Sequence, residues 1–303
     1  MTTSYHRPVL LAPLLNAVRH PARTVDATLG DGGHAEALRA AGAEVLGIDR
    51  DPDAIAVARR RLGDSRMQYV TASYGSETAL AAVAAFHPDL ILLDLGVSSR
   101  QLDQDERGFS FRPGAPLDMR MAATGPTAAE LLNRSDQAVL AAWLADWADE
   151  PRARRLAAEI IRRRSGRPFA TSDDLVNAIR AVLGARAGPA HFARIFQGIR
   201  IAVNDELAEL ERALPAFRDS LTPGGHLAVI SYHSGEDRIV KQAFQEWGRE
   251  CVCPPRQPVC TCRGHALGRP EPRKPILPEA VEIADNPRAR SAKLRIFRVA
   301  DEG

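Results

Sequence analysis

The sequence lacks the features of a secreted or membrane-spanning protein. Its N-terminal stretch has no basic segment followed by a cleavable apolar run, and no apolar run in the 303 residues approaches the roughly 20 that a spanning helix needs. Cysteine is also scarce, with four residues that all fall within residues 251–262. We therefore expect a soluble, cytoplasmic protein without a membrane partner, in which clustered cysteines favour a metal site or inert thiols over disulfides.

The chain also lacks a strong net charge and the motif of the serine hydrolases. The 40 basic and 38 acidic residues leave a formal charge of +2, so evidence for a nucleic-acid partner has to come from local patches. G-x-S-x-G is absent, because the nearest candidate, which begins at Ser231, reads Ser-Tyr-His-Ser-Gly. The apolar fraction of 45% is ample for the core of one large domain or two ordinary ones.

Residues 24–50 read as a strand, a glycine turn, a helix and a second strand. Gly32 and Gly33 let the backbone turn sharply and approach a ligand. Asp49 ends the second strand, where a carboxylate suits the ribose hydroxyls of a cofactor. S-adenosylmethionine (SAM) and nicotinamide dinucleotides both use this architecture. We favour SAM because Asp31 in the turn would repel a pyrophosphate, and a glycine turn without a ligand is the remaining alternative.

Alternating apolar runs and helical periodicity predict an α/β fold whose sheet is interrupted by helices. After the unit at residues 24–50, strands are expected at residues 67–72, 88–95, 226–231 and 294–299. Between residues 127 and 214 the periodicity is helical throughout, and its last segment, residues 191–214, reads as one helix. A block of about ninety helical residues within an α/β chain indicates an inserted domain.

Polar residues follow several predicted strands. Tyr74 and Asp94 come at the ends of the third and fourth, and a loop with Ser231 and His233 follows the fifth. Ligands bind at this edge of an open α/β sheet, so these positions are candidate contacts. The loop also reads as a helix N-cap formed by Ser234, and the two interpretations are compatible.

One predicted helix is strongly basic. Residues 152–167 carry seven arginines against one glutamate, with an apolar stripe on the opposite face. The charge suits binding of RNA phosphates, for which Arg162, Arg163 and Arg164 are the candidates, whereas a solvated helix face is the alternative.

The cysteines form two C-x-C pairs, Cys251 with Cys253 and Cys260 with Cys262, six residues apart. Four thiolates suit tetrahedral Zn²⁺, although this spacing is tighter than the usual C-x₂₋₄-C. Structural zinc is therefore a hypothesis, and inert thiols are its rival.

Long motifs run through nearly the whole chain: HRPVLL at His6, DATLGDGGHA at Asp26, LLDLGVSSRQLD at Leu92, RGFSFR…PLDMRM at Arg107, RIFQGIRIAVNDEL at Arg194, SYHSGEDRIVK at Ser231 and NPRARSAKLR at Asn286. In these motifs the chain resembles the ribosomal RNA small subunit methyltransferase H family, bacterial enzymes that use SAM to methylate the exocyclic N4 of a cytidine in the decoding region of 16S rRNA.

The resemblance implies a class I (Rossmann-like) SAM methyltransferase sheet, residues 1–105 and 210–303, with an all-helical substrate-recognition domain inserted at residues 106–209. It implies 16S rRNA or the small ribosomal subunit as partner, and a homodimer is compatible with it. The family's cofactor contacts carry over to Gly32, Gly33, His34, Asp49, Tyr74, Asp94 and Gln101. No general base can be assigned, and the catalytic candidates are Asp94, Ser231 and His233. A nicotinamide dehydrogenase and a non-catalytic RNA-binding factor are the rival functions.

Overall fold

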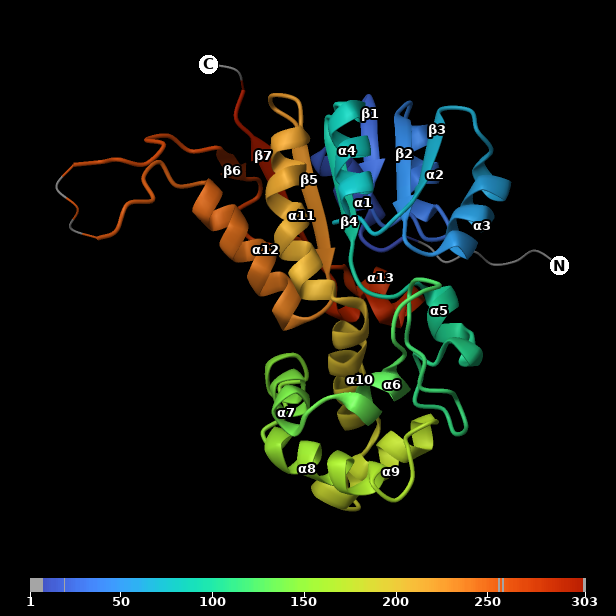
Figure 1. The fold of residues 1–303 in the computed structure, drawn as a ribbon. Coiled ribbons are helices and arrows are strands. Elements are labelled where there is room, and N and C mark those ends of the chain that lie inside the picture. Colours follow the sequence, from blue (N-terminus) through green and yellow to red (C-terminus); the bar gives the residue numbers. More distant parts are fainter. Residues whose placement is uncertain (1–7, 19, 256, 258, 302–303) are drawn as a thin grey trace. The chain divides into compact units, whose positions relative to one another are not determined.

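The chain divides into two compact units in a computed structural model that describes residues 8–18, 20–255, 257 and 259–301. The sheet unit comprises residues 1–96 and 207–303, and the helical unit comprises residues 97–206 (Figure 1). His6, where the first family motif begins, lies outside the described residues. Among the described residues, no helix has both the length and the apolar composition for crossing a membrane.

The sheet unit contains a mixed sheet of seven strands in the order β3-β2-β1-β4-β5-β7-β6. Strands β1 to β5 are parallel, and β7 is antiparallel to both of its neighbours. This confirms the expected α/β fold class. The sequence did not reveal β6, which has only three residues. The strands are β1 (Arg23–Asp26), β2 (Glu44–Asp49), β3 (Met67–Thr71), β4 (Leu90–Asp94), β5 (His226–Ser231), β6 (Gly268–Pro270) and β7 (Lys293–Val299).

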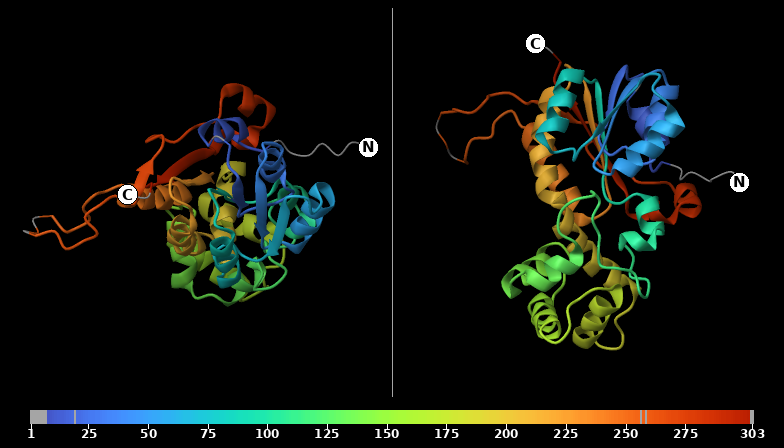
Figure 2. Two further views of the ribbon diagram at one scale, coloured as in Figure 1. Left: turned by 90° about the horizontal axis from the view of Figure 1, so that it is seen from above. Right: turned by 45° about the vertical axis from the view of Figure 1, so that its right-hand side comes forward.

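Helices cover both faces of this sheet, which explains why its central strands are almost continuously apolar (Figures 1 and 2). One face packs against α4 (Glu77–Phe86), α11 (Glu206–Ser220) and α12 (Ser234–Trp247). The other packs against α1 (Leu11–Ala17), α2 (Gly33–Ala40) and α3 (Pro52–Leu62). Two short elements, α13 (Ala280–Asp285) and η2 (Pro287–Ser291), precede β7.

The helical unit has a separate apolar core. Leu132, Leu140, Leu156, Ile179 and Ile195, from five different helices, are fully buried in it. The elements of this unit are α5 (Ser99–Asp103), η1 (Asp105–Arg107), α6 (Ala128–Arg134), α7 (Gln137–Asp146), α8 (Ala153–Arg164), α9 (Ser172–Leu183) and α10 (Pro189–Asn204).

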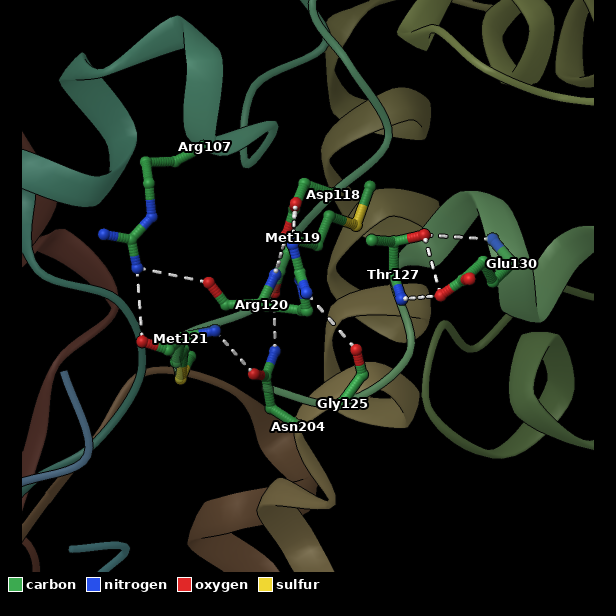
Figure 3. Close-up of polar contacts among 9 residues, drawn as sticks. All are labelled: Arg107, Asp118, Met119, Arg120, Met121, Gly125, Thr127, Glu130 and Asn204. Atoms are coloured by element: carbon green, nitrogen blue, oxygen red, sulfur yellow. Dashed lines mark hydrogen bonds and ion pairs between the residues drawn. The ribbon is translucent and has the colours of Figure 1, made fainter. Parts of the chain in front are cut away.

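The prediction of one helix over residues 191–214 was wrong. The segment is broken at Asp205, whose φ of 53° is left-handed, so that α10 ends and α11 begins there. The cause lies in the preceding residue (Figure 3). Asn204 is 8% exposed, its Oδ1 accepts from the Met121 amide at 2.8 Å, and its Nδ2 donates to the Met119 carbonyl at 2.8 Å. These bonds tie the end of α10 to the chain that leads into α6.

Backbone groups in that leading segment are held by arginines (Figure 3). The Arg107 guanidinium donates to two carbonyls, those of residues 120 and 121, at 3.2 Å each. Arg120 forms a two-pronged pair with Asp118 at 2.9 and 2.7 Å. Thr127 and Glu130 then close a capping box that starts α6. The irregular segment therefore has a specific conformation without regular secondary structure.

Candidate cofactor site

The glycine loop follows β1 and requires glycine at two positions. Gly32 has a φ of 81°, and a Cβ there would lie 2.8 Å from the Leu62 side chain. A Cβ on Gly33 would lie 2.9 Å from the Pro8 ring. The loop therefore combines the predicted sharp turn with close packing of α2 against its neighbours.

Asp49 ends β2 and is bonded directly to the glycine loop. Its Oδ2 accepts from the Gly30 amide and its Oδ1 from the Asp51 amide, each at 2.8 Å. Burial raises the pKa of this carboxyl, and the two amide bonds oppose the rise. Each oxygen keeps a further lone pair for a ligand hydroxyl. The structure thus brings two predicted contacts, the glycine loop and Asp49, into one hydrogen-bonded group.

Asp94 ends β4 and lies between His34 and Tyr232. The Tyr232 hydroxyl donates to Asp94 Oδ1 at 2.8 Å, while His34 Nδ1 lies 3.7 Å from Asp94 Oδ2. His34 Nε2 is 3.0 Å from the Val9 carbonyl, which can only accept, so Nε2 carries the proton and Nδ1 of the neutral ring does not. Burial lowers the pKa of His34. Burial also raises the pKa of Asp94, to about 7.

A third carboxyl, Asp26, lies at the end of β1 and was not among the predicted contacts. It is 1% exposed, and the Thr28 amide donates to its Oδ1 at 3.3 Å. Burial raises its pKa to about 6, and the charges of Asp94 and Asp49 add to the rise. The carboxyl ends of β1, β2 and β4 therefore present three acids whose ionised forms are all disfavoured by burial, an arrangement that favours a cationic ligand.

Tyr74 follows β3, and the loop that carries it is held by a residue that sequence reasoning missed. Glu209 of α11 is 2% exposed; it accepts from the Gly75 amide at 2.9 Å and is bonded to Arg50 and Ser73. A Cβ on Gly75 would lie 2.6 Å from the Glu209 side chain. The signal in the sequence is a glutamate on the sheet-facing side of an amphipathic helix, where an apolar residue is the rule.

The loop after β5 is organised as a helix start. His233, rather than the predicted Ser234, is the N-cap of α12. Glu236 accepts from the amides of Tyr232 at 2.8 Å and His233 at 3.2 Å. Ser231 is 2% exposed, and its hydroxyl lies 3.5 Å from the β7 carbonyl of residue 293. Of the three catalytic candidates, Ser231 and His233 make these local contacts, and the Asp94 carboxyl lies with Asp26 and Asp49 at the strand ends.

Gln101 belongs to the helical unit and lies in α5. Gln101 is 7% exposed. Its backbone amide donates to Ser98 Oγ at 3.2 Å, and its side-chain oxygen accepts from the Ser98 backbone amide at 3.0 Å. This capping box starts α5.

The basic helix is α8, and its three candidate arginines have different environments. Arg162 and Arg163 both pair with Glu159 at 2.7 Å, and Arg162 is exposed. Arg164 instead donates to two carbonyl oxygens at the end of α6, at 2.8 and 2.7 Å. Arg154 and Arg155 are also exposed on this helix. The four cysteines, in the sheet unit, lie together in the connection between α12 and β6.

Comparison with known proteins identifies relatives over the whole chain. Residues 3–300 match the model of the MraW methylase family. The chain is 56% identical over 304 residues to the ribosomal RNA small subunit methyltransferase H of Gemmatimonas aurantiaca, covering 99% of this chain and 96% of that one. It is 45% identical over 312 residues to the protein of the same name from Rubrobacter xylanophilus, covering 99% and 98%. These matches confirm the resemblance carried by the motifs.

A solved structure described as a putative rRNA methylase from Clostridium thermocellum aligns with a TM-score of 0.42 and 11% identity, covering 97% of this chain and 100% of that one. This likeness is too weak to bear on function.

Proposed function

Because the chain belongs to the MraW methylase family, we propose that it transfers a methyl group from SAM to the exocyclic N4 of a cytidine in the decoding region of 16S rRNA. Relatives that match nearly its full length carry the name of a small subunit rRNA methyltransferase. The observation that carries the proposal is the group of three acids at the strand ends beside the glycine loop, of which Asp26 is buried and Asp49 and Asp94 are half-buried. The reaction would take place in the cytoplasm, with the small ribosomal subunit as partner.

The acid group fits SAM better than a dinucleotide. SAM carries an ammonium and a sulfonium charge, either of which would relieve the cost of ionising Asp26, Asp49 and Asp94 at these strand ends. A pyrophosphate would add negative charge to the same group. The Asp49 carboxylate is already oriented by two amides and suits the ribose hydroxyls. By the family resemblance, Tyr74 would stack on the adenine.

The reaction requires positioning more than acid–base chemistry. SAM supplies an activated methyl group, and the N4 lone pair of cytosine is a weak nucleophile because it is delocalised into the ring. We propose that Asp94, fixed by the Tyr232 hydroxyl, orients the amino acid part of the cofactor. Backbone carbonyls after β4 and β5 would accept hydrogen bonds from the N4 amine. Holding N4 in line with the methyl at near-attack distance would supply a large share of the barrier reduction.

The base must leave its stack to reach such a site, so the protein must also grip the surrounding RNA. We propose that the helical unit does this through α8. Arg162 is exposed there, together with Arg154 and Arg155, and phosphate contacts by arginine are independent of sequence. Arg163 would add charge at the edge of this surface, and Arg164 would contribute through the fold of the unit.

Incubation with SAM labelled in its methyl group tests the function. Purified small subunits and naked 16S rRNA would be offered separately, digested to nucleosides and separated. We expect the label in N4-methylcytidine, with the two substrates showing whether an assembled particle is required. The Asp49→Ala variant controls for contaminating enzymes. Label in a different nucleoside would refute the proposed specificity, and tighter binding of NAD than of SAM would refute the proposed cofactor.

A further inference from the structure

The four cysteines of the chain converge in the connection between α12 and β6. Their thiol sulfurs all lie within 4.8 Å of one another. Individual Sγ–Sγ distances are 3.8 Å from Cys251 to Cys260, 3.8 Å from Cys253 to Cys260, 3.5 Å from Cys260 to Cys262 and 3.8 Å from Cys262 to Cys251. All four cysteines are free rather than paired in disulfides. None of them takes part in the cofactor site described above.

These distances match those expected around a single tetrahedral ion. With a Zn–S bond of about 2.3 Å, the edge of an S₄ tetrahedron is about 1.63 times longer, or about 3.8 Å. A disulfide would need one pair of sulfurs at about 2.05 Å. A cluster of several iron atoms would spread its four thiolates farther apart than one ion does. The geometry therefore selects a mononuclear thiolate site.

The segment also has little else to hold it together. None of the described residues from 249 to 266 is buried, and in Figures 1 and 2 this connection extends away from the sheet. Of its two valines, Val259 is 70% exposed and Val252 is only half-buried. A segment of this length without an apolar core needs another source of order, and a structural metal is one that proteins use.

Backbone contacts support thiolates at these positions. The Val252 amide lies 3.3 Å from Cys262 Sγ, and the Thr261 amide lies 3.4 Å from Cys253 Sγ. Such amides stabilise a negatively charged sulfur. Arg263, directly after the last cysteine, donates to the Glu246 carboxylate at 2.8 Å and to the Glu246 carbonyl at 2.6 Å. The residue that follows the last cysteine is thus bonded to the end of α12.

We propose that Cys251, Cys253, Cys260 and Cys262 bind one structural Zn²⁺. Each thiol gives up its proton as the metal binds, and the four thiolates fill every position of a tetrahedral ion, so no water or substrate can be coordinated. The role of the ion is to order the connection and so to hold β6 in register on β7, where Gly268 pairs with Val299. This site is independent of the proposed methyltransferase reaction.

Metal analysis of the full-length chain, purified without added metal, tests the proposal. We expect about one zinc per chain, with thiols that react only after denaturation or chelation. Replacing the zinc by Co²⁺ should give the intense visible absorption of tetrahedral cobalt with thiolate ligands. Zinc well below one per chain with four thiols that titrate freely in the native protein would overturn the proposal. Iron in place of zinc would overturn the assignment of the ion.

Variants separate metal binding from general damage. Cys260→Ser and Cys253→Ser should each lose most of the zinc and make residues 249–266 cleavable by trypsin many times faster. Val259→Ala, in the same segment, should keep both the zinc and the resistance. SAM affinity, measured by calorimetry, should stay within about threefold in all variants, which separates this proposal from that of the cofactor site. Unchanged zinc content in either cysteine variant would contradict it.

Discussion

The acids at the strand ends of the sheet unit and the arginine-paired acids of the helical unit have pKa values shifted in opposite directions. At the strand ends of the sheet unit, burial raises the pKa of Asp26, Asp49 and Asp94. In the helical unit, hydrogen bonds from Arg162 and Arg163 lower the pKa of Glu159 to about 2. At Asp118, burial raises the pKa, but the hydrogen bonds from Arg120 outweigh burial, so the pKa of Asp118 is lowered.

The difference separates charges that stabilise the fold from charges that are available for a ligand. A carboxylate paired with arginine favours the folded state when it is ionised. A buried carboxylate with a raised pKa costs stability when it ionises, and that cost is recovered only when a cation binds beside it. Groups of the second kind concentrate at functional sites. We therefore expect replacement of a strand-end acid to lower SAM affinity or to raise stability at neutral pH. Replacement of an arginine-paired acid of the helical unit should instead lower stability.

The largest effect should follow from removing Asp49. If Asp49 binds the ribose as proposed, Asp49→Ala removes two charge-assisted hydrogen bonds, together worth on the order of 3 kcal/mol, so SAM affinity should fall by about 150-fold. Asp49→Asn should lose less, because its amide oxygen can still accept one of the backbone N–H bonds. Calorimetry with SAM measures both. Asp64→Asn, at an exposed acid of the same unit, is the matched control, and an unchanged affinity in folded Asp49→Ala would remove Asp49 from the site.

A second prediction concerns stability against pH. The pKa of Asp26 is raised from 3.8 to about 6 in the folded state, so its favourable contribution is complete below pH 3.8 and is lost as pH rises through about 6. Asp26→Asn removes this loss and keeps an acceptor for the Thr28 amide. Above pH 7 the variant should therefore be more stable than the wild type, by up to roughly 3 kcal/mol. Urea unfolding at pH 4 and pH 8 measures the change.

The matched variant in the helical unit is Asp118→Asn. Because the folded pKa of Asp118 is lowered, its stabilising contribution is present above pH 3.8 and disappears as pH falls through the folded pKa. This variant should therefore be less stable than the wild type at pH 8, with the difference shrinking in acid. The same sign of change in Asp26→Asn and Asp118→Asn at pH 8 would break the comparison between the two units.

The fold was predictable where periodicity and strand-end chemistry coincide. Six of the seven strands follow from apolar runs, and three of these runs, β1, β2 and β4, end in an acid, which gives the positions of Asp49 and Asp94. Strand β6 was not predicted because three residues are too few to show a periodic pattern. The break at Asp205 escaped because its cause, the bonds from Asn204 to a segment more than eighty residues earlier, is tertiary.

The residues that hold the site residues in place were harder to predict from the sequence than the site residues themselves. Glu209 reaches the loop of Tyr74 from a helix that begins more than 130 residues later in the chain. The proton position on His34 depends on the Val9 carbonyl, and Asp26 is indistinguishable in sequence from any acid at a strand end. Spacing indicates which residues lie at one edge of a sheet, but hydrogen-bond partners depend on packing that local pattern does not encode.

The smallest expected effect concerns the arginines of α8, which are not equivalent. Arg164 is bonded to carbonyls at the end of α6, and Arg163 is half-buried beside Glu159. Replacing either would disturb the fold of the helical unit as well as its charge. Arg154, Arg155 and Arg162 are exposed and can be neutralised with less structural cost.

Changing Arg154, Arg155 and Arg162 together to Gln should therefore weaken RNA binding without changing SAM affinity. Each lost phosphate contact lowers the slope of log affinity against log salt by about 0.7 for single-stranded RNA, so three contacts lower it by about 2. Binding of 16S rRNA at several salt concentrations measures this slope. Arg164→Gln is the control, because it should reduce thermal stability and leave the slope nearly unchanged. The comparison then separates arginines that stabilise the helical unit from arginines that bind RNA phosphates. Equal slopes for the triple variant and the wild type would show that the arginine face of α8 is only solvated and that RNA binds at other surfaces.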